Sequence, residues 1–219
     1  MTLSVLAKDT VTGVIGCAAA TGNIGVGGWV LRAAPDGGAV ATQGLSVSPL
    51  WGDQALQMLR QKNSINQIFD DLIKPDSGKP CRQLAILDLD GKSRAFTGND
   101  NEDYKGSLQS NQAIFTGNWL SGPTVLEDMR SFYEQNQDME FGTRLLGCLT
   151  AAQEAGGDSR GLQSAAVKIV HKSKPPIDLR VDFDKSPIQQ LIDIYHRTTS
   201  SPYADWLTSI PTLEDPHRC

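Results

Sequence analysis

Residues 2–20 read TLSVLAKDTVTGVIGCAAA and contain two short apolar runs separated by a turn-forming segment. The runs LSVLA (3–7) and VIGCAAA (14–20) have the length and the apolar content of buried strands. Between them, DTVTG (9–13) supplies the Asp, Thr and Gly residues that favour tight turns. The sequence therefore predicts an antiparallel hairpin here.

The remaining segments alternate between strand-like and helix-like periodicity. Further strands are predicted at 39–45, 84–87, 94–97, 113–117, 165–170 and 178–181, and the segment 22–28 is interpreted as a flexible connection. Helices are predicted around 55–59, 65–73, 125–133, 141–152 and 188–195, with Ser64 as the cap of the second and Pro187 opening the last.

Hairpins are antiparallel, and here they alternate with pairs of helices. Two antiparallel sheets stacked face to face, with helices outside each, would bury every apolar stripe. A doubly wound parallel sheet fits worse, because it needs strands and helices to alternate one for one. We therefore predict an α+β fold with the layers of an αββα sandwich.

Length and composition limit the classes of function. The 219 residues, 39% hydrophobic and 21% charged, predict a globular domain over 1–197 with a C-terminal extension over 198–219. The net charge is −5 and the basic residues are dispersed, which argues against nucleic-acid binding. No apolar window could span a bilayer and the first residues do not resemble a secretory signal, so we expect a cytoplasmic protein without a membrane partner.

Metal and cofactor chemistry are not indicated. The four cysteines are isolated in the sequence and no two of the three histidines have metal-ligand spacing, so we expect neither a disulfide framework, nor a metal, nor a cofactor. The extension from residue 198 is suited to reach a neighbouring molecule, and we expect a homo-oligomer.

Thr2 is the first candidate for chemistry. It opens the first predicted strand, and removal of Met1 would expose its α-amine. A free α-amine titrates at about 7.7–8.0, so part of it is an unprotonated base at neutral pH. An N-terminal threonine can therefore supply a nucleophile and a general base in one residue. Position alone does not separate this role from that of an ordinary terminal residue.

Several motifs, in order, carry a family resemblance. They are TLSVLAKD (2–9), GAVATQ (38–43), RQLAILD (82–88), AFTG (95–98), GNWLSGPTVLEDM (117–129), GGDSRGLQSAA (156–166) and DLRVD (178–182). With them the chain resembles the family called domain of unknown function 1028, over roughly residues 2–195. That family is placed among the N-terminal-nucleophile hydrolase folds.

The resemblance implies a four-layer αββα sandwich and a hydrolase without a settled reaction. It makes Thr2 the nucleophile candidate. Asp158 then either orients the α-amine or only binds nearby backbone amides. Asn118 either donates to the oxyanion of an attacked carbonyl or caps the helix that starts near Pro123.

Four residues are candidates for substrate binding. Arg160 either binds a substrate carboxylate or pairs with Asp158 or Asp182. Thr21, Thr42 and Gln43 end predicted strands, where strand ends would meet a pocket. The family usually has Ser, Arg or His, and an aromatic residue after the second strand, whereas residues 21–23 are TGN, which makes the substrate of a relative an unsafe guide.

Two functions remain open. The first is hydrolysis of an amide or related acyl bond in a small molecule or peptide, through an acyl ester on Thr2. The second is a catalytically inactive scaffold that binds a metabolite or acts as an oligomeric structural module.

Overall fold

The computed structural model describes residues 2–158 and 160–219. These residues form two antiparallel sheets, with strand orders β10-β9-β2-β1-β8-β7 and β3-β4-β5-β6. The strands of the larger sheet are β1 (Thr2–Lys8), β2 (Ile15–Thr21), β7 (Gly106–Ser110), β8 (Ala113–Asn118), β9 (Ser164–His171) and β10 (Lys174–Val181). Those of the smaller sheet are β3 (Leu31–Ala34), β4 (Gly38–Gln43), β5 (Gln83–Leu87) and β6 (Ser93–Thr97).

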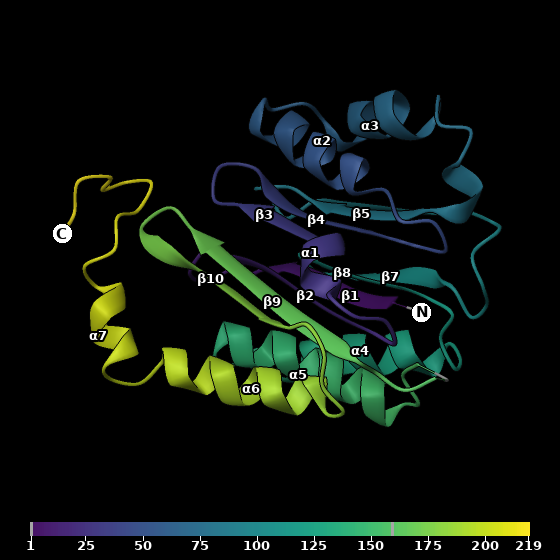
Figure 1. Ribbon diagram of the computed structural model, residues 1–219. Helices are drawn as coiled ribbons and strands as arrows, with labels where there is room; N and C mark the ends of the chain where they lie inside the picture. The colour runs from purple at the N-terminus through teal and green to yellow at the C-terminus, as the bar shows by residue number, and fades with distance from the viewer. Residues whose placement is uncertain (1, 159) are drawn as a thin grey trace.

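Helices cover the outer face of each sheet (Figure 1). On the larger sheet lie α4 (Thr124–Gln135), α5 (Phe141–Glu154) and α6 (Pro187–Thr198), and on the smaller sheet lie α2 (Pro49–Arg60) and α3 (Ile65–Ile68), which continues as a π-helical turn over Phe69–Ile73. Three buried apolar clusters fill the spaces between the four layers. The predicted four-layer αββα sandwich is confirmed.

The central strand β1 is apolar apart from Thr2, Ser4 and Lys8 because it is covered on both faces. Leu3, Val5 and Ala7 pack in the cluster beneath α4 and α5, whereas Leu6 packs in the cluster between the two sheets. All four are fully buried. A strand covered on both faces has no solvent side and so shows no polar alternation.

The first hairpin forms as predicted. Strands β1 and β2 pair from Thr2 opposite Thr21 to Lys8 opposite Ile15. In the turn, the Asp9 carboxylate accepts hydrogen bonds from the Val11 amide at 3.2 Å and the Thr12 hydroxyl at 2.7 Å. These side-chain bonds replace the ladder at the point where the chain reverses.

The flexible connection predicted over 22–28 is wrong. This segment contains the short helix α1 (Val26–Trp29), and strand β3 follows it. Val26 is buried between the sheets, and Gly27 lies so close to Ala166 of β9 that a Cβ would come within 2.8 Å of that side chain. Close packing rather than helix propensity therefore holds α1, since glycine is a poor helix former.

Strand β7 also has no counterpart in the sequence prediction. Its sequence, GSLQS, has one apolar residue in five, and its residues are only partly buried because it forms an edge of the larger sheet. Pairing with β8 rather than hydrophobic pattern makes it a strand.

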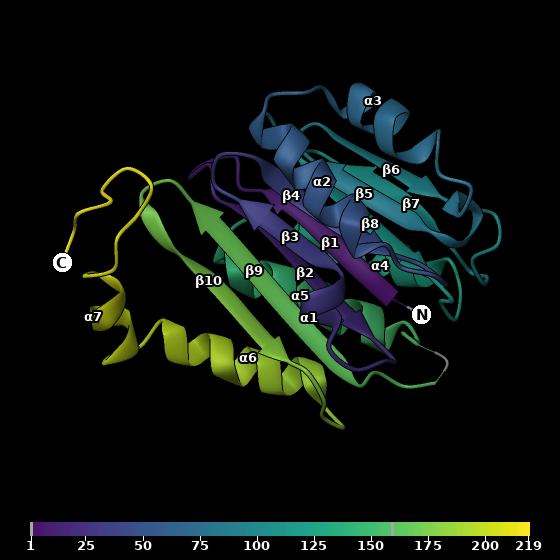
Figure 2. The same cartoon turned by 45° about the horizontal axis from the view of Figure 1, so that its top comes forward.

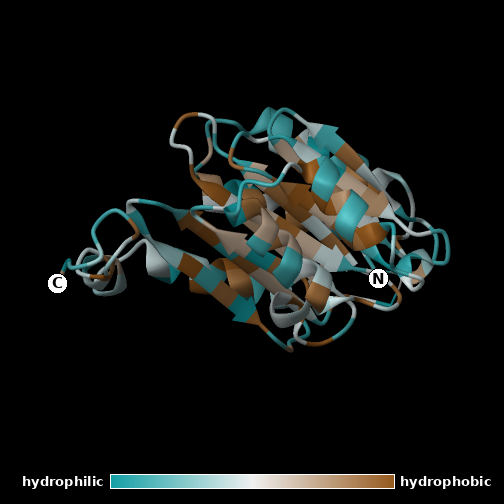
Figure 3. Ribbon diagram, turned by 90° about the horizontal axis from the view of Figure 1, so that it is seen from above, coloured by the Kyte–Doolittle hydropathy of each residue, from teal (hydrophilic) through white to brown (hydrophobic). Residues whose placement is uncertain are grey.

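Beyond α6 the chain forms only the short helix α7 (Tyr203–Leu207) and an irregular tail. Figure 2 shows this tail on the side of β10, at the opposite end of the molecule from the N-terminus. In Figure 3 the apolar residues gather in the strands of the body, while the tail projects away from it. The domain boundary at residue 197 stays a prediction. In the described ranges, no helix has the length and apolar character needed to cross a bilayer.

Candidate functional site

A buried hydrogen-bonded network joins the two sheets at the end where β1 begins. Ser4 and Thr116 are opposite each other on β1 and β8, while Gln43 and Gln83 are opposite each other on β4 and β5. The Ser4 hydroxyl donates to Gln43 Oε1 at 2.9 Å and lies 2.7 Å from the Thr116 hydroxyl. All four side chains are buried, and each buried polar group in this network has a partner, as stable interiors require.

Gln83 is the hub of this network. Its Oε1 accepts hydrogen bonds from Gln43 Nε2 at 2.7 Å and from Asn118 Nδ2 at 3.0 Å. Its Nε2 donates to the Thr97 hydroxyl at 2.8 Å and to the Gly117 carbonyl at 2.9 Å. One amide thus fixes side chains from both sheets.

Thr2 lies at the edge of this network. As the first residue of β1 it pairs with Thr21 on one side and Asn118 on the other. Its Oγ1 is 3.1 Å from Thr21 Oγ1, and its carbonyl accepts a hydrogen bond from Gln43 Nε2 at 3.3 Å. The backbone of Thr2 is therefore held by three neighbouring strands, while its side chain is half-buried.

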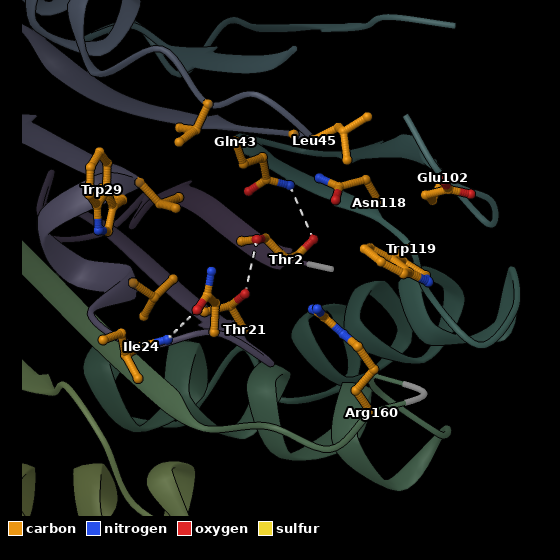
Figure 4. Close-up of a pocket in the computed structure, with 15 residues that line it drawn as sticks. Thr2, Thr21, Ile24, Trp29, Gln43, Leu45, Glu102, Asn118, Trp119 and Arg160 are labelled. Atoms are coloured by element: carbon orange, nitrogen blue, oxygen red, sulfur yellow. Dashed lines mark hydrogen bonds between the residues drawn. The ribbon is translucent and has the colours of Figure 1, made fainter. Parts of the chain in front are cut away.

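A cavity of about 440 Å³ opens over Thr2. Figure 4 shows Thr2 near its centre, with side chains converging from both sheets and from the loops between them. Its lining is formed by Thr2, Thr21, Asn23, Ile24, Val26, Trp29, Val30, Gln43, Gly44, Leu45, Val47, Glu102, Asn118, Trp119 and Arg160. A volume of this size suits a small ligand.

Asn118 faces this cavity and does not cap a helix. The helix α4 begins after Pro123 without a side-chain cap, and Asn118 instead donates one amide hydrogen to Gln83. A carboxamide nitrogen carries two hydrogens, so a second donor is held in a fixed orientation beside Thr2.

Asp158 lies beyond the N-terminal end of β1. Its backbone bridges Leu120, two residues past the partner of Thr2 on β8. Its carboxylate lies against Gly22, which follows Thr21, the partner of Thr2 on β2. A Cβ added at Gly22 would come within 2.7 Å of Asp158 Cγ. A larger residue at position 22 would therefore displace this carboxylate. The departure from the family pattern at residues 21–23 thus bears directly on Asp158.

Arg160 pairs with Asp158, as one of the two interpretations expected, and the binding of a substrate carboxylate stays a prediction. It pairs with Asp158 through Nε at 3.2 Å and Nη2 at 3.1 Å, and it also lines the cavity. Its guanidinium lies 4.4 Å from the ring centre of Trp119. Trp119 has a φ of 58°, a left-handed backbone rarely adopted by large residues and often found at functional sites.

Of two further predicted binding residues, Thr42 lies away from the cavity, whereas Gln43 lines it. Thr42 does not line the cavity, because successive strand residues point to opposite faces. Its hydroxyl donates to the Ser48 carbonyl at 2.9 Å, beneath α2. Gln43 lines the cavity, but its amide nitrogen already donates to Thr2 and Gln83 and its oxygen accepts from Ser4. Both hydrogens of the Gln43 amide are therefore engaged within the protein, and a role of Gln43 in substrate binding stays a prediction.

Sequence reasoning did not single out Gln83, Glu102 or the apolar residues Ile24 and Trp29. Gln83 had a usable signal, since it is a polar residue at the start of the apolar run LAIL. The other three lie in loops or in α1, where no period in the sequence indicates a cavity.

Comparisons with known proteins agree on one family. A model of a family of unknown function (DUF1028) matches residues 2–191. The chain is also similar to a protein from Silicibacter pomeroyi whose crystal structure is known and which is described as having the same family model. The identity is 42%, the TM-score is 0.94, and the match covers 99% of this chain and 98% of that one. No curated protein matches. The chain therefore belongs to the DUF1028 family, whose function is unknown.

Proposed function

We propose that the protein is an N-terminal-nucleophile hydrolase that cleaves an amide or related acyl bond, with Thr2 as nucleophile. One observation carries the proposal: a threonine heads a central strand, faces a cavity, and has a fixed amide donor beside it in Asn118. The proposal requires removal of Met1, which lies outside the described residues.

The reaction would proceed in two halves. The α-amine of Thr2 takes the proton from Oγ1 as that oxygen attacks the substrate carbonyl. Asn118 Nδ2 donates to the developing oxyanion, and the leaving amine departs with the proton from the α-ammonium. Water then attacks the resulting ester, the α-amine takes and returns a proton, and a carboxylic acid is released.

Two neighbouring residues would support these steps. Thr21 Oγ1 is within hydrogen-bonding distance of the attacking oxygen and would orient it. Asp158, buried beyond the end of β1, would stabilise the α-ammonium that forms between proton transfers. Both are positioning roles.

The test is a comparison of three chains: wild type, Thr2→Ala and Thr2→Ser. Intact mass first shows whether Met1 is absent, and a β-lactone electrophile then probes the free nucleophile. We expect one lactone mass on wild type and on Thr2→Ser, and none on Thr2→Ala. Turnover of a cleaved amide should fall roughly 10³-fold or more in Thr2→Ala, while its free energy of unfolding changes by less than about 1 kcal/mol. Full turnover by Thr2→Ala, or a chain that retains Met1 when active, would refute the scheme.

A binding protein without turnover is the second candidate. The same cavity and inter-sheet network would hold a metabolite that is not cleaved, and Arg160 and Asn118 would contact it directly. A purified chain that retains Met1 and still binds a ligand would favour this alternative.

Two expectations stay predictions. The exposed side chains of Tyr203, Trp206 and Leu213 on the tail are suited to contact a second copy in a homo-oligomer. Light scattering of the full chain and of a chain ending at residue 198 tests this, because only the full chain should then associate. Cytoplasmic location likewise stays a prediction.

A further inference from the structure

The cavity over Thr2 has two unlike sides. Figure 4 shows Ile24 and Trp29 on one side of Thr2, and Glu102, Trp119 and Arg160 on the other. A ligand that fills the cavity therefore meets apolar groups at one end and charged groups at the other.

The apolar side presents large side chains to solvent. Ile24 is 58% exposed and Trp29 is 53% exposed, while Val26 and Val30 are buried behind them in the cavity wall. Two large apolar side chains at the edge of one cavity are a binding feature rather than scattered surface residues. They suit an aromatic ring or an alkyl chain.

The charged side carries one anion, Glu102, and one cation, Arg160, with Trp119 between them. The backbone carbonyl of Glu102 accepts a hydrogen bond from the Trp119 amide at 2.8 Å, which brings Glu102 to the cavity. Figure 4 shows the Arg160 side chain on the opposite side of the Trp119 ring from Glu102.

Both charged side chains keep bonding capacity for a ligand. Asp158 engages Nε and Nη2 of Arg160, and within residues 2–158 and 160–219 no group accepts a hydrogen bond from Nη1. Glu102 is exposed and lines the cavity, and across the same ranges its carboxylate accepts no hydrogen bond. Because Asp158 already neutralises Arg160, this side does not favour a lone anion. A group with both a carboxylate and an ammonium matches it better.

We propose that the cavity binds amides that join an apolar group to the side chain of a free α-amino acid. The α-carboxylate binds Arg160, the α-ammonium binds Glu102, the apolar group lies on Trp29 and Ile24, and the amide lies over Thr2. This inference rests on the proposed function of the site. Two orientations share the chemistry: a γ-glutamyl amide of an aromatic amine, and a lysine acylated on Nζ.

Hydrolysis balances in either orientation. A γ-glutamyl anilide and water give glutamate and the aniline, whereas Nζ-phenylacetyl-lysine and water give phenylacetate and lysine. In both, the bond that breaks is the amide C–N bond, and the group retained on Thr2 as an ester is the acyl half.

Binding is measured first, by calorimetry on the Thr2→Ala variant, which removes turnover. The probes are γ-glutamyl-p-nitroanilide and Nζ-phenylacetyl-lysine. Matched probes lack one feature each: glutaryl-p-nitroanilide lacks the ammonium, 4-aminobutyryl-p-nitroanilide lacks the carboxylate, and γ-glutamyl methylamide lacks the ring. In the γ-glutamyl orientation we expect each omission to weaken binding roughly 10-fold or more, because a charged hydrogen bond or the apolar contact is lost.

Two further variants assign the contacts. Glu102→Gln keeps the shape of an exposed side chain and should abolish the preference for γ-glutamyl over glutaryl anilide. Trp29→Ala should abolish the preference for the anilide over the methylamide. Both substitutions are at exposed side chains, so the fold should persist. Arg160→Gln is less suitable because it removes an ion pair of the buried Asp158 carboxylate.

The outcomes separate this inference from the proposed function. Binding of these amino-acid amides without hydrolysis by the wild type would refute the hydrolase and keep the binding specificity. Hydrolysis of other amides, with neither probe bound, would overturn the specificity alone. Equal binding of glutaryl and γ-glutamyl anilides, or an unchanged ratio in Glu102→Gln, would overturn the γ-glutamyl orientation, and no binding of Nζ-phenylacetyl-lysine would then overturn the specificity as a whole.

Discussion

The space between the two sheets has an apolar end and a polar end. Toward the middle and far end of β1, Leu6, Ile15 and Ile114 belong to one apolar cluster with Ala39 and Ala41 of β4 and Ala85 and Leu87 of β5. At the N-terminal end, Ser4 and Thr116 meet Gln43 and Gln83 through hydrogen bonds. The layer between the two sheets is therefore held together by apolar packing at one end and by hydrogen bonds at the other.

The difference has a structural consequence. Apolar contacts are non-directional, so the far end fixes how close the sheets lie but not the rotation of any side-chain group. Hydrogen bonds are directional, so the polar end fixes the amides of Gln43 and Asn118, and through Gln43 the carbonyl of Thr2. We therefore expect side-chain orientations to be precisely fixed where the network lies. Where the network is absent, we expect substitutions in the core to leave the geometry of the site unchanged.

Substitution at the apolar end should give the largest loss of stability. Leu6→Ala leaves a cavity between the sheets, and we expect a loss of about 2–5 kcal/mol in the free energy of unfolding. The residue lies four positions from Thr2, about 13 Å along the strand, so activity per folded molecule should not change. Urea unfolding and turnover of the same samples measure both.

Leu50→Ala is the matched control, because Leu50 is 68% exposed on α2 and should cost less than about 0.5 kcal/mol. If Leu6→Ala reduced kcat as strongly as substitutions in the network do, the two ends would not be separate.

Substitution at the polar end should reverse the pattern. Gln83→Leu removes the oxygen that accepts hydrogen bonds from the amide nitrogens of Gln43 and Asn118, and we expect a loss of about 1–3 kcal/mol in the free energy of unfolding. Because Asn118 then loses its orientation, kcat should fall by about 10-fold or more while KM changes little.

The control is Gln109→Leu, which removes an exposed glutamine of β7 whose side-chain amide donates to Ser93. Its stability and kcat should stay near wild type. Unchanged kcat in Gln83→Leu would contradict a positioning role for the network.

Substitution in a polar cluster of the helix layer, around Glu140, should give the smallest loss of stability. Glu140 precedes α5, and its carboxylate accepts hydrogen bonds from the amides of Gly142 and Thr143 and from the Tyr195 hydroxyl. Partial burial raises the pKa of Glu140, but these hydrogen bonds outweigh it, and the pKa lies below the ordinary value. Glu140 therefore stabilises the fold above the ordinary glutamate pKa, and this contribution disappears as the pH falls through the lowered value.

We expect Glu140→Gln to cost about 0.5–1 kcal/mol at pH 7, at the low end for a helix cap because solvent screens this exposed group. The difference in the free energy of unfolding between wild type and Glu140→Gln should shrink below about pH 4. Unfolding at pH 7 and pH 3 tests this, with Glu134→Gln on α4 as control. Turnover should not change, because this cluster lies in a different layer from the cavity. A pH-independent difference would show that the carboxylate charge is not the cause.

Much of the fold was predictable from local pattern. The first hairpin, the pair β5–β6, the long helices α4, α5 and α6, and the cap at Ser64 follow from periodicity and turn residues, and each is present. The short elements α1, β3 and β7 were missed and depend on neighbours far away in sequence, and the short helix α7 was missed as well. A segment of four or five residues cannot show a period, so packing decides it.

The site divides in the same way. Thr2 and Asn118 were predicted, and the pairing register of β1 with β8 brings them side by side. Thr42 and Gln43 were predicted together, yet strand alternation places only Gln43 at the cavity. Glu102, Trp29 and Ile24 come from separate loops and α1, and no spacing in the chain relates them to Thr2.

The sequence by itself determined the four layers, the hairpin that starts them and the identity of the threonine at the head of β1, because these depend on neighbours in the chain and on apolar period. Tertiary structure alone decided that Gln83 orients the amides at the site, that Asp158 lies beyond the end of β1, and that the cavity has one apolar and one charged side. The physical reason is that a hydrogen bond or an ion pair forms only when its two polar atoms lie within about 3 Å of each other. For residues that are far apart in the sequence, only the packed sheets bring these atoms to that distance.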